Sequence, residues 1–159
     1  MKTIYFWALI YAGLGALSCD PIARQVVDPT EQSSQALIES VTAQGSSGAY
    51  SFSVRISSPD TGCDQYADWW EVVSDSGTLL YRRILAHSHV DEQPFTRSGS
   101  PVPVSADQSI WVRVHMNNTG YSDFGAKGSI NEGFERALLD PNFAPTLDEE
   151  EPLPSNCAF

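Results

Sequence analysis

The feature that most constrains the fold is a series of short segments in which apolar and polar residues alternate. Residues 50–57 place Tyr, Phe, Val and Ile at every second position, with Ser or Arg between them. Residues 110–117 repeat the pattern with Ile, Val, Val and Met. Because successive side chains of a strand point to opposite faces, both segments predict strands with one buried face.

Weaker runs predict further strands around these two segments. They cover residues 37–42, 66–73, 78–89, 101–104 and 124–130, with a loop expected over residues 94–99. No long helical pattern separates them, so the sequence predicts an all-β antiparallel sandwich of about seven strands. Residues 131–139 predict one or two helical turns that end at Asp140-Pro141, and a Pro-rich, acidic tail follows.

Two of these segments resemble strands of the fibronectin type III and immunoglobulin-like sandwiches. Residues 66–72 contain Trp69 and Trp70, as the third strand of those domains carries a core tryptophan. Residues 110–120 resemble the sixth strand and its Asn/Gly turn. The resemblance covers residues 36–130 and implies that the third strand lies between the fourth and the sixth. It implies no particular function, because this fold hosts many.

Residues 1–18 have the pattern of an export signal. Lys2 precedes an uncharged run over residues 3–17, which is short for a membrane span. Residues 15–19, Gly-Ala-Leu-Ser-Cys, resemble the lipobox of bacterial lipoproteins, although Ala16 stands where Leu is usual. The resemblance implies cleavage before Cys19 and a lipid anchor, with an acyl chain such as palmitate, on that cysteine. The alternative is an ordinary secretory signal that leaves Cys19 as a thiol.

The chain has three cysteines, and an odd number in an exported protein needs an explanation. If Cys19 carries lipid, Cys63 and Cys157 remain as a pair that an oxidising compartment would allow to form a disulfide. Two buried free thiols are the alternative. The expected organisation is a signal peptide (1–18), a tether (19–35), the sandwich (36–130) and a C-terminal extension (131–159) packed on or disulfide-pinned to the domain.

The net charge of −11 argues against nucleic acid as a partner, because phosphate binding depends on Lys and Arg. The lipobox-like signal predicts a location in the bacterial cell envelope, on the periplasmic or the outer side of a membrane. There the N-terminal lipid would hold the chain at that membrane.

Three predicted loops meet at one end of an immunoglobulin-like sandwich, namely residues 58–65, 87–97 and 117–123. They carry the candidate binding residues Asp60, Asp64, Asp91, Glu92 and Tyr121.

Histidines near the same loops form a candidate metal site. His87 and His89 share one face at a spacing of two, and with His115 they would suit Zn²⁺ or Cu²⁺. The loop carboxylates would instead suit Ca²⁺. The alternative is that the histidines only hydrogen-bond backbone at strand ends.

An outward-facing aromatic pair is the other candidate site. If Trp70 enters the core, the adjacent Trp69 faces outward, and Trp111 faces outward beside Arg113 on the neighbouring strand. Such a surface suits a glycan or an envelope protein. The alternative is that the C-terminal tail covers both tryptophans as a second small core.

No nucleophile-elbow, zinc-protease or phosphate-loop motif occurs in the sequence. Asp91 and Glu92 could act as an acid/base pair, but a solvated turn also explains them. The sequence thus predicts a noncatalytic, lipid-anchored binding or interaction domain of the envelope, with an unknown ligand. A divalent-metal protein is the alternative, and an enzyme acting on envelope substrates is the third possibility.

Overall fold

The structure is a computed structural model that describes residues 34–158. The account below concerns the unit formed by residues 32–159. The predicted signal peptide (1–18), Cys19 and nearly all of the tether lie outside the described residues. Within the described part, no helix is long and apolar enough to cross a membrane.

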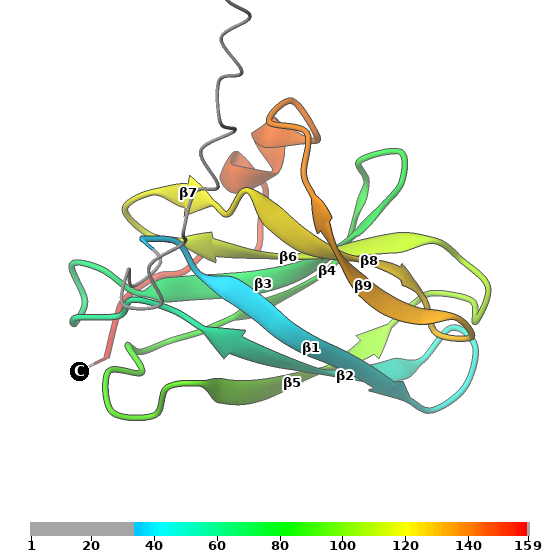
Figure 1. The fold of residues 1–159 in the computed structure, drawn as a ribbon, viewed down its shortest axis with the longest axis horizontal. Coiled ribbons are helices and arrows are strands. Elements are labelled where there is room, and N and C mark those ends of the chain that lie inside the picture. The colour runs from blue at the N-terminus through cyan, green and yellow to red at the C-terminus, as the bar shows by residue number, and fades with distance from the viewer. Residues whose placement is uncertain (1–33, 159) are drawn as a thin grey trace, which may run out of the picture. The chain divides into compact units, whose positions relative to one another are not determined.

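Two antiparallel sheets form the domain, as Figure 1 shows. The smaller sheet has the order β1-β2-β5, formed by Leu37–Gln44, Tyr50–Ser57 and Phe95–Val102. The larger sheet has the order β4-β3-β6-β8-β9, formed by Leu79–Ile84, Ala67–Ser74, Ile110–Met116, Phe124–Ser129 and Gly133–Leu138. The two-residue strand β7 (Gly120–Tyr121) pairs with β6, and one 3₁₀ turn, η1, covers Pro145–Glu149. The predicted all-β sandwich is confirmed, and β3 lies between β4 and β6 as the resemblance implied.

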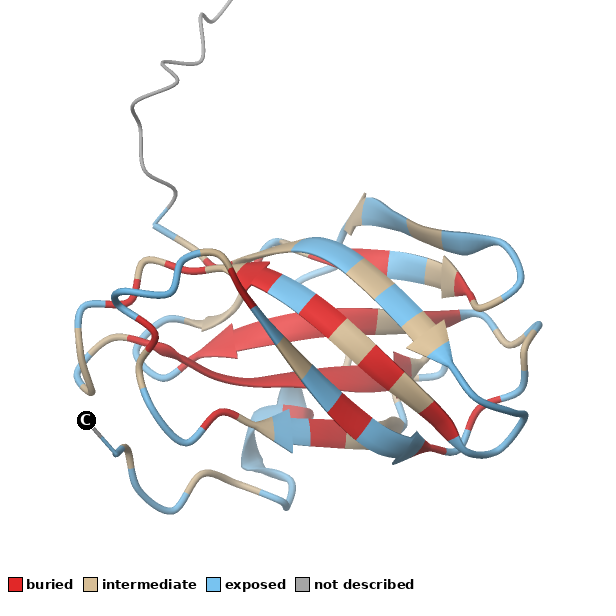
Figure 2. Cartoon of the chain, turned by 90° about the horizontal axis from the view of Figure 1, so that it is seen from below, coloured by how far each residue is buried: buried red, intermediate tan, exposed pale blue. Residues whose placement is uncertain are grey.

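The core lies between the inward faces of the two sheets. Phe52, Val54 and Ile56 of β2 meet Trp70 and Val72 of β3 there, and none of these five is exposed. On β2 the serines and arginine between the core residues stay partly or fully exposed, which gives the alternation visible in Figure 2. The assignment of Trp70 to the core is therefore confirmed.

The predicted helical turns over residues 131–139 are wrong, because this segment forms β9. It pairs with β8 in an unbroken register from Phe124↔Leu138 to Ser129↔Gly133. Gly133, at φ 85°, makes the tight reversal, a conformation that costs glycine little. Phe134 then reaches the core and meets Phe52 edge-on, with ring centroids 6.0 Å apart. Pairing the otherwise unpaired edge of β8 outweighs the local helical spacing of Phe134 and Leu138.

The predicted loop over residues 94–99 is also wrong, since β5 begins at Phe95 and pairs with β2. Gly99 allows this strand to pass close to the opposite sheet. A side chain there would place its Cβ 2.5 Å from the ring of Tyr81.

Candidate functional site

The outward face of the larger sheet carries a ladder of directly paired side chains. Trp69 of β3 lies opposite His115 of β6, and Glu71 lies opposite both Arg113 of β6 and Arg82 of β4. Neighbouring strands bring such partners within contact distance on one face. In most antiparallel sandwiches a charged row like this faces water, but here it is buried.

Glu71 is the centre of a buried ion network. Its side chain is fully buried, and its two oxygens accept hydrogen bonds from Nε of Arg82 at 2.7 Å and Nε of Arg113 at 2.6 Å. Nη2 of Arg82 also lies 2.6 Å from a Glu71 oxygen, and the Nη atoms of both arginines reach carbonyl oxygens beyond the sheet. This leaves one net positive charge in the triad, with donors available for a further layer.

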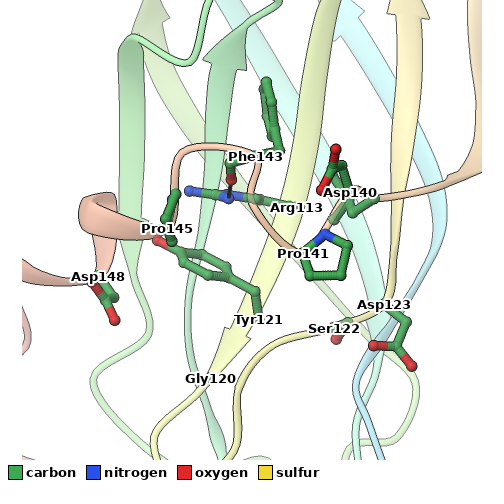
Figure 3. Close-up of a pocket in the computed structure, with 11 residues that line it drawn as sticks. Arg113, Gly120, Tyr121, Ser122, Asp123, Asp140, Pro141, Phe143, Pro145 and Asp148 are labelled. Atoms are coloured by element: carbon green, nitrogen blue, oxygen red, sulfur yellow. Dashed lines mark hydrogen bonds between the residues drawn. The ribbon is translucent and has the colours of Figure 1, made fainter.

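The C-terminal tail supplies that layer. Arg113 donates to the carbonyl oxygens of Phe143 and Ala144 at 2.8 and 2.9 Å, and Figure 3 shows this arginine between Phe143 and Tyr121. Arg82 donates to three carbonyl oxygens farther along the tail, those of Leu147, Glu150 and Pro152. Two arginines on the sheet thus hold the tail through its backbone carbonyl oxygens.

Trp69 does not form an open binding surface, which corrects that expectation. It is 3% exposed, because the ring of His115 stacks on it at 3.6 Å and the guanidinium of Arg82 lies 4.6 Å from its ring centre. Trp111 is half-buried between Phe143 and the ammonium group of Lys127. The tail therefore lies against Trp111 through Phe143, as the alternative expected, whereas Trp69 is covered by His115 and Arg82 of the sheet itself.

Tyr121 and Arg113 are packed together under the same tail. The Arg113 guanidinium lies 3.6 Å from the Tyr121 ring centre, a cation–π contact. Burial, followed by the negative charge of Glu71, raises the pKa of the Tyr121 hydroxyl. Both residues line a pocket of about 260 Å³ between β7 and the tail, together with Asp140, Pro141 and Asp148 (Figure 3).

A second, larger groove of about 490 Å³ lies beside His115. The sheet side contributes Tyr66, Asp68, Trp69, His115 and Asn117, and the tail side contributes residues 153–157. Nδ1 of His115 lies 2.7 Å from an oxygen of Asp68, which fixes the ring orientation. Within the described part of the chain, Nε2 of this ring makes no hydrogen bond that would occupy it, so it remains able to contact a ligand.

The disulfide between Cys63 and Cys157 closes this end of the groove. It links residues 94 apart in sequence and is the pair expected from the cysteine count. Next to it, the backbone N–H of Ala158 donates to the carbonyl oxygen of Ala86 at 2.7 Å. The end of the tail is therefore tied to the sandwich at two neighbouring points.

The predicted meeting of three loops at one end of the sandwich is found. Asp60 is buried there, and its carboxylate accepts hydrogen bonds from the hydroxyl of Ser58 and from the backbone N–H groups of Ala67 and His89. Asp60 consequently holds two loops together rather than facing a ligand. Across the same end, the side chain of Asn117 bonds to the backbone of Tyr66 and Cys63.

The three predicted metal-binding histidines do not come together as one group. His87 and His89 are neighbours, with ring centroids 4.4 Å apart, whereas His115 belongs to the Trp69–Asp68 cluster. Glu92 joins the histidine pair instead, and one ligand atom from each of these three side chains lies within 4.8 Å of the others. Burial, with Arg97 and His87 nearby, lowers the pKa of His89 to about 4.

The remaining predicted site residues are spread over the surface of this end. Asp64 is exposed in the loop before β3, and Asp91 is exposed in the loop before β5. Glu92 is exposed, and its hydrogen bond from Arg97 at 2.6 Å lowers its pKa. Glu92 is thus paired with Arg97, and an acid/base role for Asp91 and Glu92 stays a prediction.

Asp68, Glu71 and Arg82 were not among the predicted site residues. One sequence feature could have indicated them. Acidic and basic residues occur on predicted neighbouring strands that also contain tryptophan. What buries them is a tail about 70 residues farther along, and no local pattern reveals that contact.

Comparison with known proteins gives one informative match. A protein of Halomicrobium mukohataei named "Putative lipoprotein" is 35% identical over an alignment of 131 residues that covers 74% of this chain and 65% of that protein. The chain thus spans slightly less than two thirds of the length of this relative. No family model and no solved structure matches the chain. The similarity supports a lipid-anchored envelope protein, and it adds no ligand.

Proposed function

We propose that the protein is a lipid-anchored, noncatalytic binding domain of the cell envelope. The groove between His115 and the tail would bind a neutral, hydroxyl-rich ligand such as an envelope oligosaccharide. The observation that carries this proposal is the 490 Å³ groove with the fixed Asp68–His115 pair at its floor. Small-ligand sites in proteins commonly have volumes of about 300–1,000 Å³ and a few convergent polar groups.

The anchor is supported by two independent observations. The lipobox-like residues 15–19 end at Cys19, and a relative with 35% identity carries a lipoprotein name. If residues 1–18 are removed, Cys19 becomes the N-terminus and the sandwich follows after a short polar segment. Such a segment would keep the groove close to the envelope material that surrounds the membrane.

The charge of the groove determines the ligand class. Carboxylates of Asp68 and Asp148 line it, and the chain as a whole has a net charge of −11. An anionic ligand would be repelled, while hydroxyl groups donate to carboxylates and accept from ring N–H groups. An uncharged sugar surface satisfies both kinds of partner without a charge penalty.

A substitution that fills the groove tests this function. Ser155 is exposed on the tail side, so Ser155→Trp should obstruct the groove while the sandwich stays folded. Ser105→Trp is the matched control, since Ser105 is exposed in the loop before β6, outside the groove-lining residues. Neutral oligosaccharides prepared from the envelope would be titrated against each protein by calorimetry.

We expect the wild type and Ser105→Trp to bind the same fraction, and Ser155→Trp to lose at least about tenfold in affinity, or 1.4 kcal/mol. Binding that Ser155→Trp leaves unchanged would place the ligand elsewhere. No binding of any neutral fraction by the wild type would overturn the proposed ligand class.

The anchor has its own test. Cells expressing the wild type or Cys19→Ser would be fractionated, and the protein would be followed through detergent phase separation. The wild type should enter the detergent phase, and Cys19→Ser should remain in the aqueous phase. Equal partitioning of the two proteins would contradict lipid attachment at Cys19.

A further inference from the structure

The loop between β4 and β5 brings together three side chains that commonly bind metals. One ligand atom each from His87, His89 and Glu92 lies within 4.8 Å of the others. His87 and Glu92 are exposed, whereas His89 is 2% exposed. None of the three lines the groove described above, so this cluster is a separate feature of the molecule.

His89 is held rigidly, yet its two ring nitrogens make no hydrogen bond. Its ring stacks on Phe95 at 3.8 Å with planes 9° apart, and its backbone N–H donates to Asp60 at 2.8 Å. Both ring nitrogens are buried and make no hydrogen bond. Buried polar groups in proteins nearly always have a hydrogen-bond partner or a metal ligand bond. The unpaired imidazole of His89 therefore indicates that a ligand binds there.

We propose that His87, His89 and Glu92 form a site for a divalent transition metal, with Zn²⁺ as the preferred ion. Two imidazoles and one carboxylate are a ligand set that zinc takes, with a fourth position left for water or another ligand. A single carboxylate is too few for Ca²⁺, which takes six to eight oxygens.

The spacing fits a site that closes on the ion. Zinc bonds of about 2.0–2.2 Å place ligand atoms roughly 3–3.5 Å apart in a tetrahedral site. His87 and Glu92 can cover the remaining distance by side-chain rotation because both are exposed. His89 would stay in place as the fixed ligand.

The buried carboxylate of Asp60 lies close to the ring of His89, the fixed ligand. An oxygen of Asp60 lies 3.8 Å from Nδ1 of His89, slightly beyond hydrogen-bond distance. Histidines that bind metal through one nitrogen usually donate the other N–H to such a group, which fixes the tautomer. With Nδ1 on the side of Asp60, Nε2 of His89 would be the metal ligand.

Arg97 competes with the metal for Glu92. Its guanidinium donates to the Glu92 carboxylate at 2.6 Å. A cation that takes this carboxylate must share it with, or displace, the arginine. Removing Arg97 should consequently strengthen metal binding, an effect opposite in direction to that of removing a ligand.

The test uses the full-length protein in detergent, stripped with a chelator and titrated with Zn²⁺ by calorimetry. Co²⁺ absorption would report the coordination geometry. The variants are His87→Ala, Glu92→Gln and Arg97→Gln, all at exposed or partly exposed positions, with His115→Gln as the histidine control. Circular dichroism of each variant would confirm that it is folded.

We expect one Zn²⁺ per chain, a tenfold to hundredfold loss in affinity for His87→Ala and a smaller loss for Glu92→Gln. Arg97→Gln should bind more tightly than the wild type, and His115→Gln should bind like it. Absence of stoichiometric Zn²⁺ binding by the folded wild type would overturn the site. So would a His115→Gln variant that loses as much affinity as His87→Ala.

Discussion

The outward faces of the two sheets differ in what covers them. On the smaller sheet, β2 alternates between buried core residues and half-exposed or exposed Ser51, Ser53 and Arg55. On the larger sheet, β3 is buried at seven successive positions, from Ala67 to Val73, because the C-terminal tail lies on its outer side. Figure 2 shows the two patterns. The difference shows that charged residues on a strand need not face water. On β3 the charged face is covered by the backbone of the C-terminal tail.

Removal of the tail should have the largest effect on stability. A chain that ends at Asp140 loses the burial of Leu147, worth about 1.5–3 kcal/mol, and the Cys63–Cys157 disulfide, worth about 2–4 kcal/mol, so we expect a loss of roughly 4–7 kcal/mol. Urea unfolding followed by tryptophan fluorescence would measure it. Replacing Glu149, Glu150 and Glu151 with Gln is the control, and it should cost less than about 1 kcal/mol. A truncated chain as stable as the control would mean that the tail only rests on the sheet.

Loss of the disulfide should have a smaller effect. Cys157→Ser frees the last residues of the tail while the arginine contacts remain, and we expect a loss of about 2–4 kcal/mol. Limited proteolysis should then cleave the tail near its end before the sandwich. If Cys157→Ser unfolds at the same urea concentration as the wild type, the arginines alone hold the tail.

Acid should weaken the loop end of the sandwich in metal-free protein. The pKa of His89 is about 4 in the folded chain against an ordinary value of 6.5, so the unfolded chain binds more protons between these values. This contribution to stability is complete above about pH 6.5 and is lost as the pH falls toward 4.

The charged and titratable neighbours His87, Asp60, Glu92 and Arg97 contribute to the same titration. His89→Phe keeps the stacking position against Phe95 and removes the titrating group. Urea midpoints measured across this pH range should fall less steeply for His89→Phe than for the wild type. Parallel pH profiles for the two proteins would contradict a buried neutral His89.

The smallest effect is expected on the uncovered sheet. Arg55 pairs with Glu39 at 2.8 Å, and both side chains are more than one third exposed. Arg55→Gln should change stability by less than about 0.5 kcal/mol, because exposed ion pairs contribute little. Thermal unfolding would measure this, and a loss above about 1.5 kcal/mol would show that the smaller sheet also has a covering layer.

The sequence predicted the sandwich because its signals there are local. Alternation of apolar and polar residues was enough to predict β2 and β6, and turn residues marked the ends of the predicted strands. Phe134 and Leu138 fit a helical face equally well, and the pairing of this segment with the neighbouring strand β8 decides for a strand. Cys63 and Cys157 could be paired by counting, since the third cysteine had another assignment.

The candidate sites were predictable only in part. The spacing of two between His87 and His89 predicted that they lie together. Glu92 was predicted as a loop carboxylate, and not as a partner of these histidines. The predicted strand order placed His115 near these two histidines. In the structure it pairs instead with Asp68 of the adjacent strand β3. The burial of Glu71 could not be predicted from local sequence, because it depends on carbonyl oxygens of the tail that bind its two arginine partners.

The central claim is that the tail turns Glu71 into a buried charge, and one comparison tests it most directly. The free energies of unfolding of Glu71→Gln and Glu39→Gln would be measured side by side in the full-length protein. The account predicts a loss of about 3–5 kcal/mol for Glu71→Gln, which leaves two arginines unpaired, and less than about 1 kcal/mol for Glu39→Gln. Equal, small losses for both variants would contradict it.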